Sequence, residues 1–106
     1  MVQSRVRLAF STGRLREALG ILSPLAERIR VDPACLGCHL YRDMQEDSVL
    51  MLEEVWRSED DHVRHLRSNE YRNVLLVMEM ALGPPEISFN TISCSAGLEA
   101  IERARR

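Results

Sequence analysis

The chain has 106 residues, the size of one small domain, and 45% of them are hydrophobic while 28% are charged. This composition is too apolar for a disordered protein, and the net charge of -2 argues against nucleic-acid binding through many phosphate contacts. No apolar run has the length of a signal peptide or a membrane span, so we expect a cytoplasmic protein with neither a membrane nor a nucleic-acid partner. Its three cysteines are then expected to stay reduced.

The chain is predicted to begin with a strand and a long helix. Residues 6–10 alternate large apolar side chains with Arg or Ala, the pattern of a half-buried strand. Residues 13–30 carry apolar side chains at helical spacing, which predicts an amphipathic helix. Because an interior proline removes a backbone hydrogen-bond donor, we expect a kink or a short break at Pro24.

The middle of the chain predicts a β-hairpin followed by a short helix. Residues 35–44 and 48–56 are β-rich runs, and the stretch between them is polar. Ser58, with Asp61 three residues later, is typical of a helix start, and the helix is expected to run to about Arg67.

A second helix, a last strand and a terminal helix follow. Ser68 is a cap residue for a helix over 69–82, which Gly83 and two prolines terminate. Residues 86–94 predict a strand, and residues 97–106 predict a short amphipathic helix.

The order β-α-β-β-α-α-β predicts a ferredoxin-like α+β fold, one antiparallel sheet with its helices on one face. We expect a single domain over residues 1–106, with a core from about 5 to 94 and a short helix after it. Since the strands are apolar on more than one side, the open face of the sheet also needs a cover. A second copy of the same sheet supplies one, which predicts a homodimer through the open sheet face.

The segment CLGCH at residues 35–39 matches the C-x-x-C-H pattern of covalent c-type haem attachment. Side chains alternate along a strand, so Cys35 and Cys38 are expected to point to opposite faces of the sheet. That arrangement argues against covalent haem, a redox pair and a zinc half-site, and there is no second CxxC to complete four ligands. We therefore interpret the cysteines as small packing residues and expect no metal site.

Glu54 and Trp56 are two residues apart in a predicted strand and so share one face with neighbouring leucines. An acid in an apolar row must be paired, protonated or functional. Its structural role would be a hydrogen bond to a helix group such as His65, whereas the indole of Trp56 suits the flat wall of a site for an aromatic compound.

His62 and His65 are one turn apart on a predicted helix, and either can carry a proton near neutral pH. We expect His62 to lie on the surface by default.

His39 and Tyr41 share one face of their predicted strand, but the hairpin register decides whether it is the face of Glu54. A pairing of Tyr41 with Leu50 brings both residues into one pocket with Glu54. A pairing of Arg42 with Leu50 brings in Cys38 and Leu40 instead. The sequence leaves both registers open.

The order of elements and the segments DPACLGCHLYRD, LEEVW and SEDDHVRHLRS resemble the antibiotic biosynthesis monooxygenase (ABM) family of small dimeric α+β-barrel proteins, over roughly residues 5–94. The resemblance is carried by Glu54-Val55-Trp56, by Ser58 and by His65-Leu66. The family includes cofactor-free oxygenases that convert phenols or hydroquinones to quinones, haem-degrading enzymes, an isomerase of a signalling metabolite and proteins with no known activity.

The chain departs from the family pattern at three places. The turn that usually reads Pro-Gly-Cys is here Pro-Ala-Cys at residues 33–35, and the aromatic residue common three positions after that Cys is here Cys38. Haem-degrading members hold the iron with a Trp and then a His some ten residues later; here the first position holds His65, and residues 71–74 contain no His. Haem degradation is therefore a poor fit, and the resemblance also argues against a metal site built from Glu54, His62 and His65.

The resemblance implies a cofactor-independent monooxygenase that oxidises a small phenol or hydroquinone to a quinone, with no cofactor and no metal. The implied catalytic residues are His65 and Glu54, and the implied substrate-binding residues are Trp56, Tyr71, His39, Tyr41, Asn90 and His62. Two alternatives stay open: a non-catalytic dimeric module that binds a small apolar ligand, and an isomerase of a small carbonyl compound.

Overall fold

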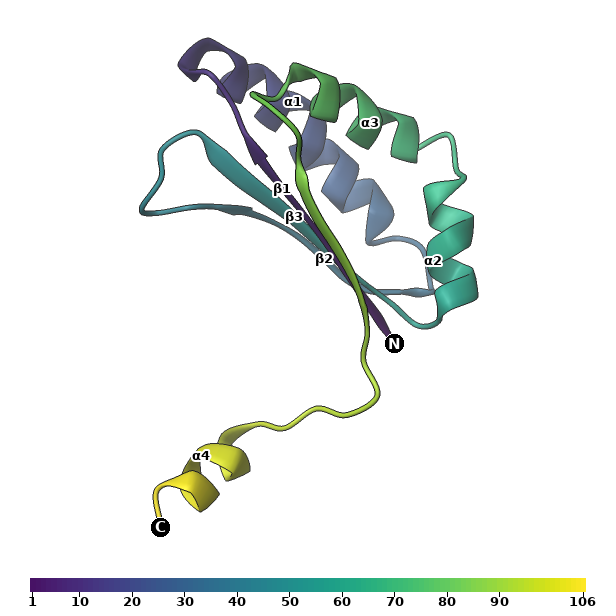
Figure 1. Ribbon diagram of the computed structural model, residues 1–106. Helices are drawn as coiled ribbons and strands as arrows, with labels where there is room; N and C mark the ends of the chain where they lie inside the picture. The colour runs from purple at the N-terminus through teal and green to yellow at the C-terminus, as the bar shows by residue number, and fades with distance from the viewer.

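The computed structural model describes residues 1–106 and has eight elements in the expected order, with a fourth helix at the end (Figure 1). The elements are β1 (Val2–Ala9), α1 (Thr12–Ile29), β2 (Cys35–Arg42), β3 (Val49–Trp56), α2 (Glu59–Leu66), α3 (Tyr71–Met80), β4 (Glu86–Thr91) and α4 (Leu98–Ala104). The four strands form one antiparallel sheet in the order β2-β3-β1-β4. This topology confirms the predicted ferredoxin-like α+β fold.

Helices α1, α2 and α3 lie together on one face of the sheet, and no helix covers the other face (Figure 1). Alternation along the strands decides which side chains enter the core. Along β1, Val2, Ser4, Val6 and Leu8 are buried toward the helices, while the residues between them are more exposed. The largest side chains that are fully buried in this core are Trp56, Leu8, Leu22, Leu25, Ile29, Leu50 and Leu52.

The first two elements differ from their predicted forms. Strand β1 begins at Val2 rather than at residue 6, because its first residues pair with the end of β3. Helix α1 runs through Pro24 with no break, so the break expected there is wrong. Pro24 has no N–H to donate to the carbonyl of Gly20, the residue four positions before it. Both residues are exposed, so water can form the missing hydrogen bond.

The hairpin register is the decisive feature for the site. Arg42 pairs with Leu50, so Cys38 lies opposite Glu54 on the helix-facing side of the sheet. A bulge at Leu36 inserts one extra residue between Cys35 and Gly37. Cys35 therefore lies opposite the end of β3 on the same face as Cys38, and the expectation that the two thiols point to opposite faces is wrong.

The predicted start of α2 is confirmed. The hydroxyl of Ser58 accepts a hydrogen bond from the backbone N–H of Asp61 at 3.2 Å and donates one to the Asp61 carboxylate at 2.7 Å. Arg57 and Arg64 pair with the same carboxylate. These contacts hold the first turn of α2 against the end of β3 and fix the direction of its histidines.

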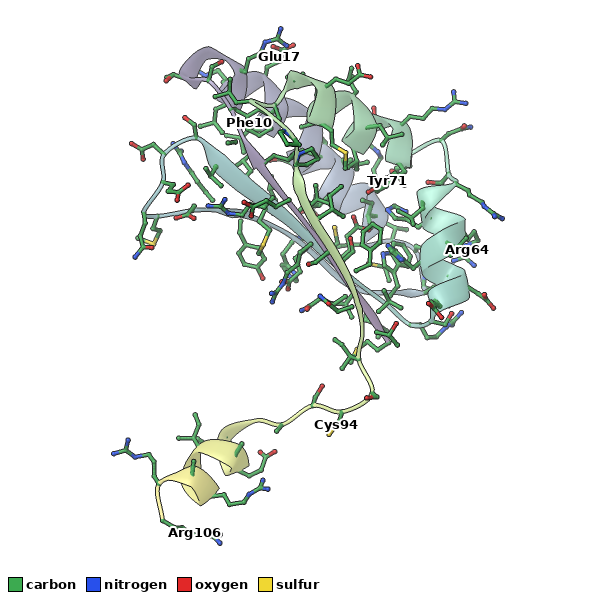
Figure 2. All side chains as sticks on the ribbon, viewed as in Figure 1. Phe10, Glu17, Arg64, Tyr71, Cys94 and Arg106 are labelled. Carbon is green, nitrogen blue, oxygen red and sulfur yellow. The ribbon has the colours of Figure 1, made fainter.

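The chain beyond β4 leaves the body of the molecule. Its last backbone hydrogen bond to the body runs from the N–H of Ile92 to the carbonyl of Met1. Helix α4 then stands apart, as the positions of Cys94 and Arg106 in Figure 2 show. None of the four helices has the length and apolarity that a membrane crossing requires.

Candidate active site

The candidate site is centred on the carboxylate of Glu54, which is fully buried on the helix-facing side of β3. The indole Nε1 of Trp56 donates a hydrogen bond of 2.9 Å to Glu54 Oε1. Ser4 on β1 and Cys38 on β2 pair with Glu54 from the two neighbouring strands, and both are buried. The carboxylate therefore lies in the centre of the sheet, where water does not reach it.

Helix α2 brings a histidine directly onto this carboxylate. Nε2 of His65 lies 2.9 Å from Glu54 Oε1, and the imidazole stacks on Trp56 with ring centroids 4.5 Å apart. Tyr71, the first residue of α3, packs edge-on against the same imidazole at 5.3 Å. Four residues singled out in the sequence thus form one contact cluster, and Figure 2 shows Tyr71 between the sheet and the helices.

His62 lies one turn before His65 and is also buried, so its expected surface position is wrong. Both histidines are among the buried residues of α2, since residues one turn apart share a side of the helix. The ring of His62 meets Phe89 of the edge strand β4 edge-on, with centroids 4.7 Å apart. Phe89 is 47% exposed, so this contact marks the boundary between the cluster and solvent.

Three buried polar atoms of the cluster have no hydrogen-bond partner: Oε2 of Glu54, Nε2 of His62 and Nε2 of His65. Nε2 of His65 and Oε1 of Glu54 approach each other closely, but their geometry is unsuited to a hydrogen bond. Folded proteins pair nearly all of their buried polar groups, because an unpaired one costs about 1–3 kcal/mol. A polar group of a ligand that entered the cluster could form the hydrogen bonds that these three atoms lack.

Burial controls protonation around the carboxylate. It lowers the pKa of His62, an effect that nearby His65 reinforces and Glu54 opposes. It raises the pKa of Tyr71 to about 12 and that of Cys38 to about 12, and the charge of Glu54 adds to both shifts. At neutral pH, Tyr71 and Cys38 are therefore protonated and His62 is a neutral imidazole, so neither the phenol nor the thiol serves as a base.

Three predicted substrate-binding residues lie elsewhere. The register places His39 and Tyr41 opposite Glu53 and Met51 on the open face of the sheet, with their rings 6.1 Å apart. Asn90 pairs with Gln3, and its exposed side chain belongs to the same open face. The structure therefore does not bring His39, Tyr41 or Asn90 together with Glu54.

Residues 1–75 of the chain match the family model described as "Antibiotic biosynthesis monooxygenase" (ABM), which covers more than half of the sequence. The chain belongs to the ABM family. No curated protein matches it.

Solved structures share the fold of this ABM-family protein. A Deinococcus radiodurans protein assigned to the antibiotic biosynthesis monooxygenases is 16% identical with a TM-score of 0.83, and the match covers 92% of this chain and 98% of that one. Rv0793 from Mycobacterium tuberculosis is 22% identical with a TM-score of 0.77, and the match covers 91% of this chain and 98% of that one. A Caulobacter crescentus protein assigned to the same monooxygenases is 21% identical with a TM-score of 0.75, covering 84% and 86%. At these identities the likeness shows the fold alone.

Sequence reasoning missed Ser4 and Phe89 as neighbours of the cluster around Glu54, and it left the position of Cys38 open. Ser4 lies before the strand that periodicity predicted, so nothing placed it beside Glu54. Cys38 was one of two register alternatives, and Phe89 gave no signal beyond a strand pattern. The alternation of Val2, Ser4 and Val6 was the one readable sign, because it puts Ser4 on the buried face.

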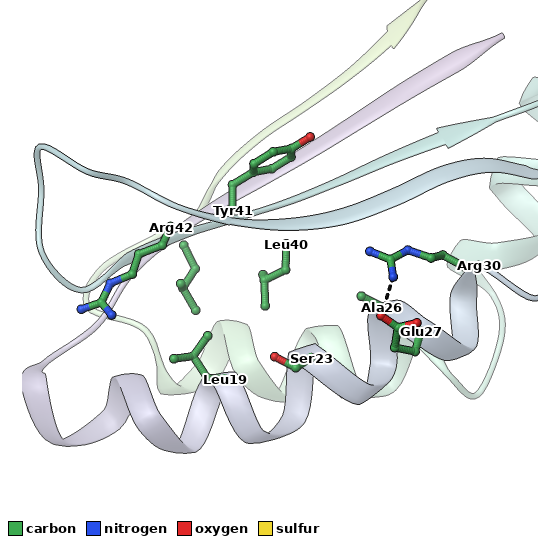
Figure 3. Close-up of a pocket in the computed structure, with 9 residues that line it drawn as sticks. Leu19, Ser23, Ala26, Glu27, Arg30, Leu40, Tyr41 and Arg42 are labelled. Carbon is green, nitrogen blue, oxygen red and sulfur yellow. Dashed lines mark hydrogen bonds and ion pairs between the residues drawn. The ribbon is translucent and has the colours of Figure 1, made fainter.

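The surface hollows of the molecule do not reach the cluster. One of about 300 Å³ lies between α1 and β2, lined in part by Leu19, Ser23 and Leu40, and Figure 3 shows the ring of Tyr41 directed away from it. Hollows of about 310 Å³ and 120 Å³ are lined by β-sheet residues that include Arg7 and Met51. The cluster around Glu54 is therefore closely packed, and no group of three or more His, Cys, Asp or Glu side chains is arranged to hold a metal ion.

Proposed function

We propose that this ABM-family protein is a cofactor-independent monooxygenase that oxidises a small phenol or hydroquinone to a quinone. The observation that carries the proposal is the buried cluster of Glu54, His62 and His65, in which three polar atoms lack partners beside the rings of Trp56 and Tyr71. A planar substrate with an ionisable hydroxyl complements such a cluster. Its oxygen forms hydrogen bonds with the unpaired atoms, and its ring packs against the rings of Trp56 and Tyr71.

The chemistry requires the substrate to supply the electrons. Removal of a proton gives an electron-rich anion that reduces O₂. One oxygen atom then enters a C–H position of the ring, which gives a quinone from a phenol and a hydroxyquinone from a hydroquinone, and the other leaves as water with two hydrogens of the substrate. The protein must take the proton, exclude bulk water and hold the ring. In this proposal the His65–Glu54 pair handles the proton, and Trp56 and protonated Tyr71 form the walls.

Entry of the substrate requires the packed cluster to open at its solvent boundary. That boundary is the contact between His62 and Phe89. Strand β4 pairs only with β1 and all its residues are exposed, so the side chain of Phe89 can move without loss of the core. We propose that the aromatic ring enters past Phe89 and that His62 binds its polar substituent.

The proposal includes a homodimer in the cytoplasm. All three cysteines are free thiols, which suits a reducing compartment. The open face of the sheet has no cover of its own, and it carries the half-buried apolar side chains of Met51 and Val55 beside Tyr41. A second copy of the sheet would bury these residues together with His39 and Asn90.

The test is oxygen consumption by the chelator-treated protein with a panel of hydroquinones, naphthols and anthrones. We expect uptake with quinone formation on at least one compound, and a decrease of about 100-fold to 10,000-fold in His65→Ala. Trp56→Phe should also decrease the rate, because it removes the N–H that holds Glu54. The matched control His39→Ala changes a histidine on the opposite face of the sheet from Glu54 and should keep the wild-type rate.

Two results would overturn the proposal. Full turnover by His65→Ala on a proven substrate would remove the residue from the chemistry. No uptake on any compound, with a substrate-sized aromatic still bound, would favour the non-catalytic ligand-binding module.

A further inference from the structure

The hollow of about 300 Å³ between helix α1 and strand β2 lies apart from the buried carboxylate cluster and takes no part in the proposed function. On one side of it, Leu19, Ser23 and Ala26 of α1 are directed toward the sheet (Figure 3). Leu40 of β2 and Leu50 of β3 line the opposite side. The hollow is therefore mainly apolar, and its volume suits a small molecule.

The hollow lies at the margin of the core because β2 is the edge strand of the sheet. Leu19 and Leu40 are half-buried there, whereas Leu50 on the neighbouring strand is 1% exposed. The apolar walls thus keep a surface in contact with water that a bound apolar group would cover. Removal of this surface from water favours binding.

The free edge of β2 offers hydrogen-bond donors along the rim of the hollow. The N–H of Asp43 donates to the carbonyl of Val49 at the start of β3 at 3.0 Å. In an antiparallel pair, residues that bond to the partner strand alternate with residues whose N–H and C=O groups point away from it. The backbone N–H groups of Arg42 and Leu40 therefore point away from β3, toward the open edge.

The two arginines at the ends of the hollow differ in their partners. At one end, Nε of Arg30 donates a hydrogen bond of 2.6 Å to the carbonyl of Cys38, and the same guanidinium forms an ion pair with Glu27. At the other end, the guanidinium of Arg42 has no carboxylate partner (Figure 3). Because Glu27 offsets the charge of Arg30, the lining keeps one positive charge, that of Arg42.

We propose that this hollow binds a small amphipathic monocarboxylate, with its apolar part between α1 and β2 and its carboxylate on Arg42. A guanidinium can give a carboxylate two parallel hydrogen bonds, and the backbone N–H of Arg42 is a third donor beside it. A second carboxylate on the ligand would meet the apolar walls or the charge of Glu27, so the site favours a single charge. This binding site is separate from the proposed oxidation and adds to it.

The experiment is calorimetric titration of the full chain with octanoate and, in parallel, with the uncharged octanol. We expect octanoate to bind the wild type at one site per chain. Arg42→Gln should weaken octanoate binding about 10-fold and leave octanol binding unchanged, because hydrogen bonds to a charged group are lost only for octanoate. Ser23→Trp fills the hollow and should abolish the binding of both compounds. The matched control Arg72→Gln removes the charge of an exposed arginine on α3 and should change the octanoate affinity less than about twofold.

Four results would overturn this site, and none of them depends on oxygen consumption. Absence of octanoate binding to the wild type at millimolar concentration removes the site. Equal affinity of the wild type and Arg42→Gln removes the carboxylate anchor, and equal weakening by Arg72→Gln assigns the effect to net charge. Octanoate binding that survives in Ser23→Trp places the ligand elsewhere. Since Ser23 is exposed, the thermal unfolding midpoint of Ser23→Trp should match the wild type, and Arg42→Gln tests the site independently of it.

Discussion

The polar groups on the two faces of the sheet differ in their burial and in their pairing. On the face covered by helices, Glu54, His62 and His65 are buried and keep three polar atoms without partners. On the open face, Arg5 and Glu53 are accessible to solvent and yet form an ion pair. Water satisfies exposed polar groups at no cost, whereas buried ones usually need a protein partner.

The covered face is therefore suited to binding a ligand, and the open face is suited to contact with another protein surface. The unpaired atoms of the covered face offer hydrogen bonds to a molecule that enters the core. The paired charges of the open face leave little unsatisfied charge when a protein surface covers it. Two adjacent acids of one strand show this difference between the faces, since Glu53 and Glu54 point to opposite faces of β3.

The largest expected effect on stability comes from the core side of β3. Trp56→Ala removes a fully buried indole and leaves the Glu54 carboxylate without its hydrogen-bond donor. We expect it to lower the free energy of unfolding by about 3–5 kcal/mol. The neighbouring open-face change Val55→Ala should cost about 1 kcal/mol or less in dilute protein.

Urea denaturation monitored by circular dichroism measures both values. If the second copy covers the open face, the cost of Val55→Ala should grow with protein concentration while that of Trp56→Ala stays constant. Equal costs for the two variants in dilute protein would contradict the difference between the faces.

A smaller effect concerns the pH dependence of folding. Burial lowers the pKa of His62 below its ordinary value of 6.5, so the folded chain binds fewer protons at this residue than the unfolded chain does. Stability therefore rises with pH in this range, and it falls as the pH drops below about 6.5. His62→Gln should reduce the slope of the unfolding midpoint against pH between about 6.5 and 5.

The control for this measurement is His39→Gln in dilute protein, where this histidine of the open face is exposed to solvent. A wild-type slope in His62→Gln would show that His62 is not buried as a neutral ring.

The sequence predicted the fold because the fold depends on local signals. Ser58 and Asp61 formed the expected helix start, and the spacing of apolar residues located every element. The errors lie where water or pairing overrides a local preference. Pro24 is tolerated because Gly20, whose carbonyl it leaves without a partner, is an exposed residue, and β1 begins early because β3 offers partners to its first residues.

The site was predictable only in part. Glu54 and Trp56 share a face by alternation alone, so that pair followed from the sequence. The position of Cys38 depends on a one-residue choice of register, and that of Cys35 on a bulge at Leu36. Such choices depend on the packing of the whole hairpin, which leaves no signature in a single segment.

The most direct test of the catalytic role of the buried cluster compares the two adjacent carboxylates of β3 in the oxygen-consumption assay. Glu54→Gln keeps an oxygen that can accept the hydrogen bond from Trp56 but removes the charge beside His65. Glu53→Gln removes the same charge from the open face, where Glu53 pairs with Arg5. We predict that turnover on the best substrate of the panel falls by about 100-fold or more in Glu54→Gln and stays near the wild-type value in Glu53→Gln. Equal turnover in the two variants would contradict the assignment of the buried cluster as the catalytic site.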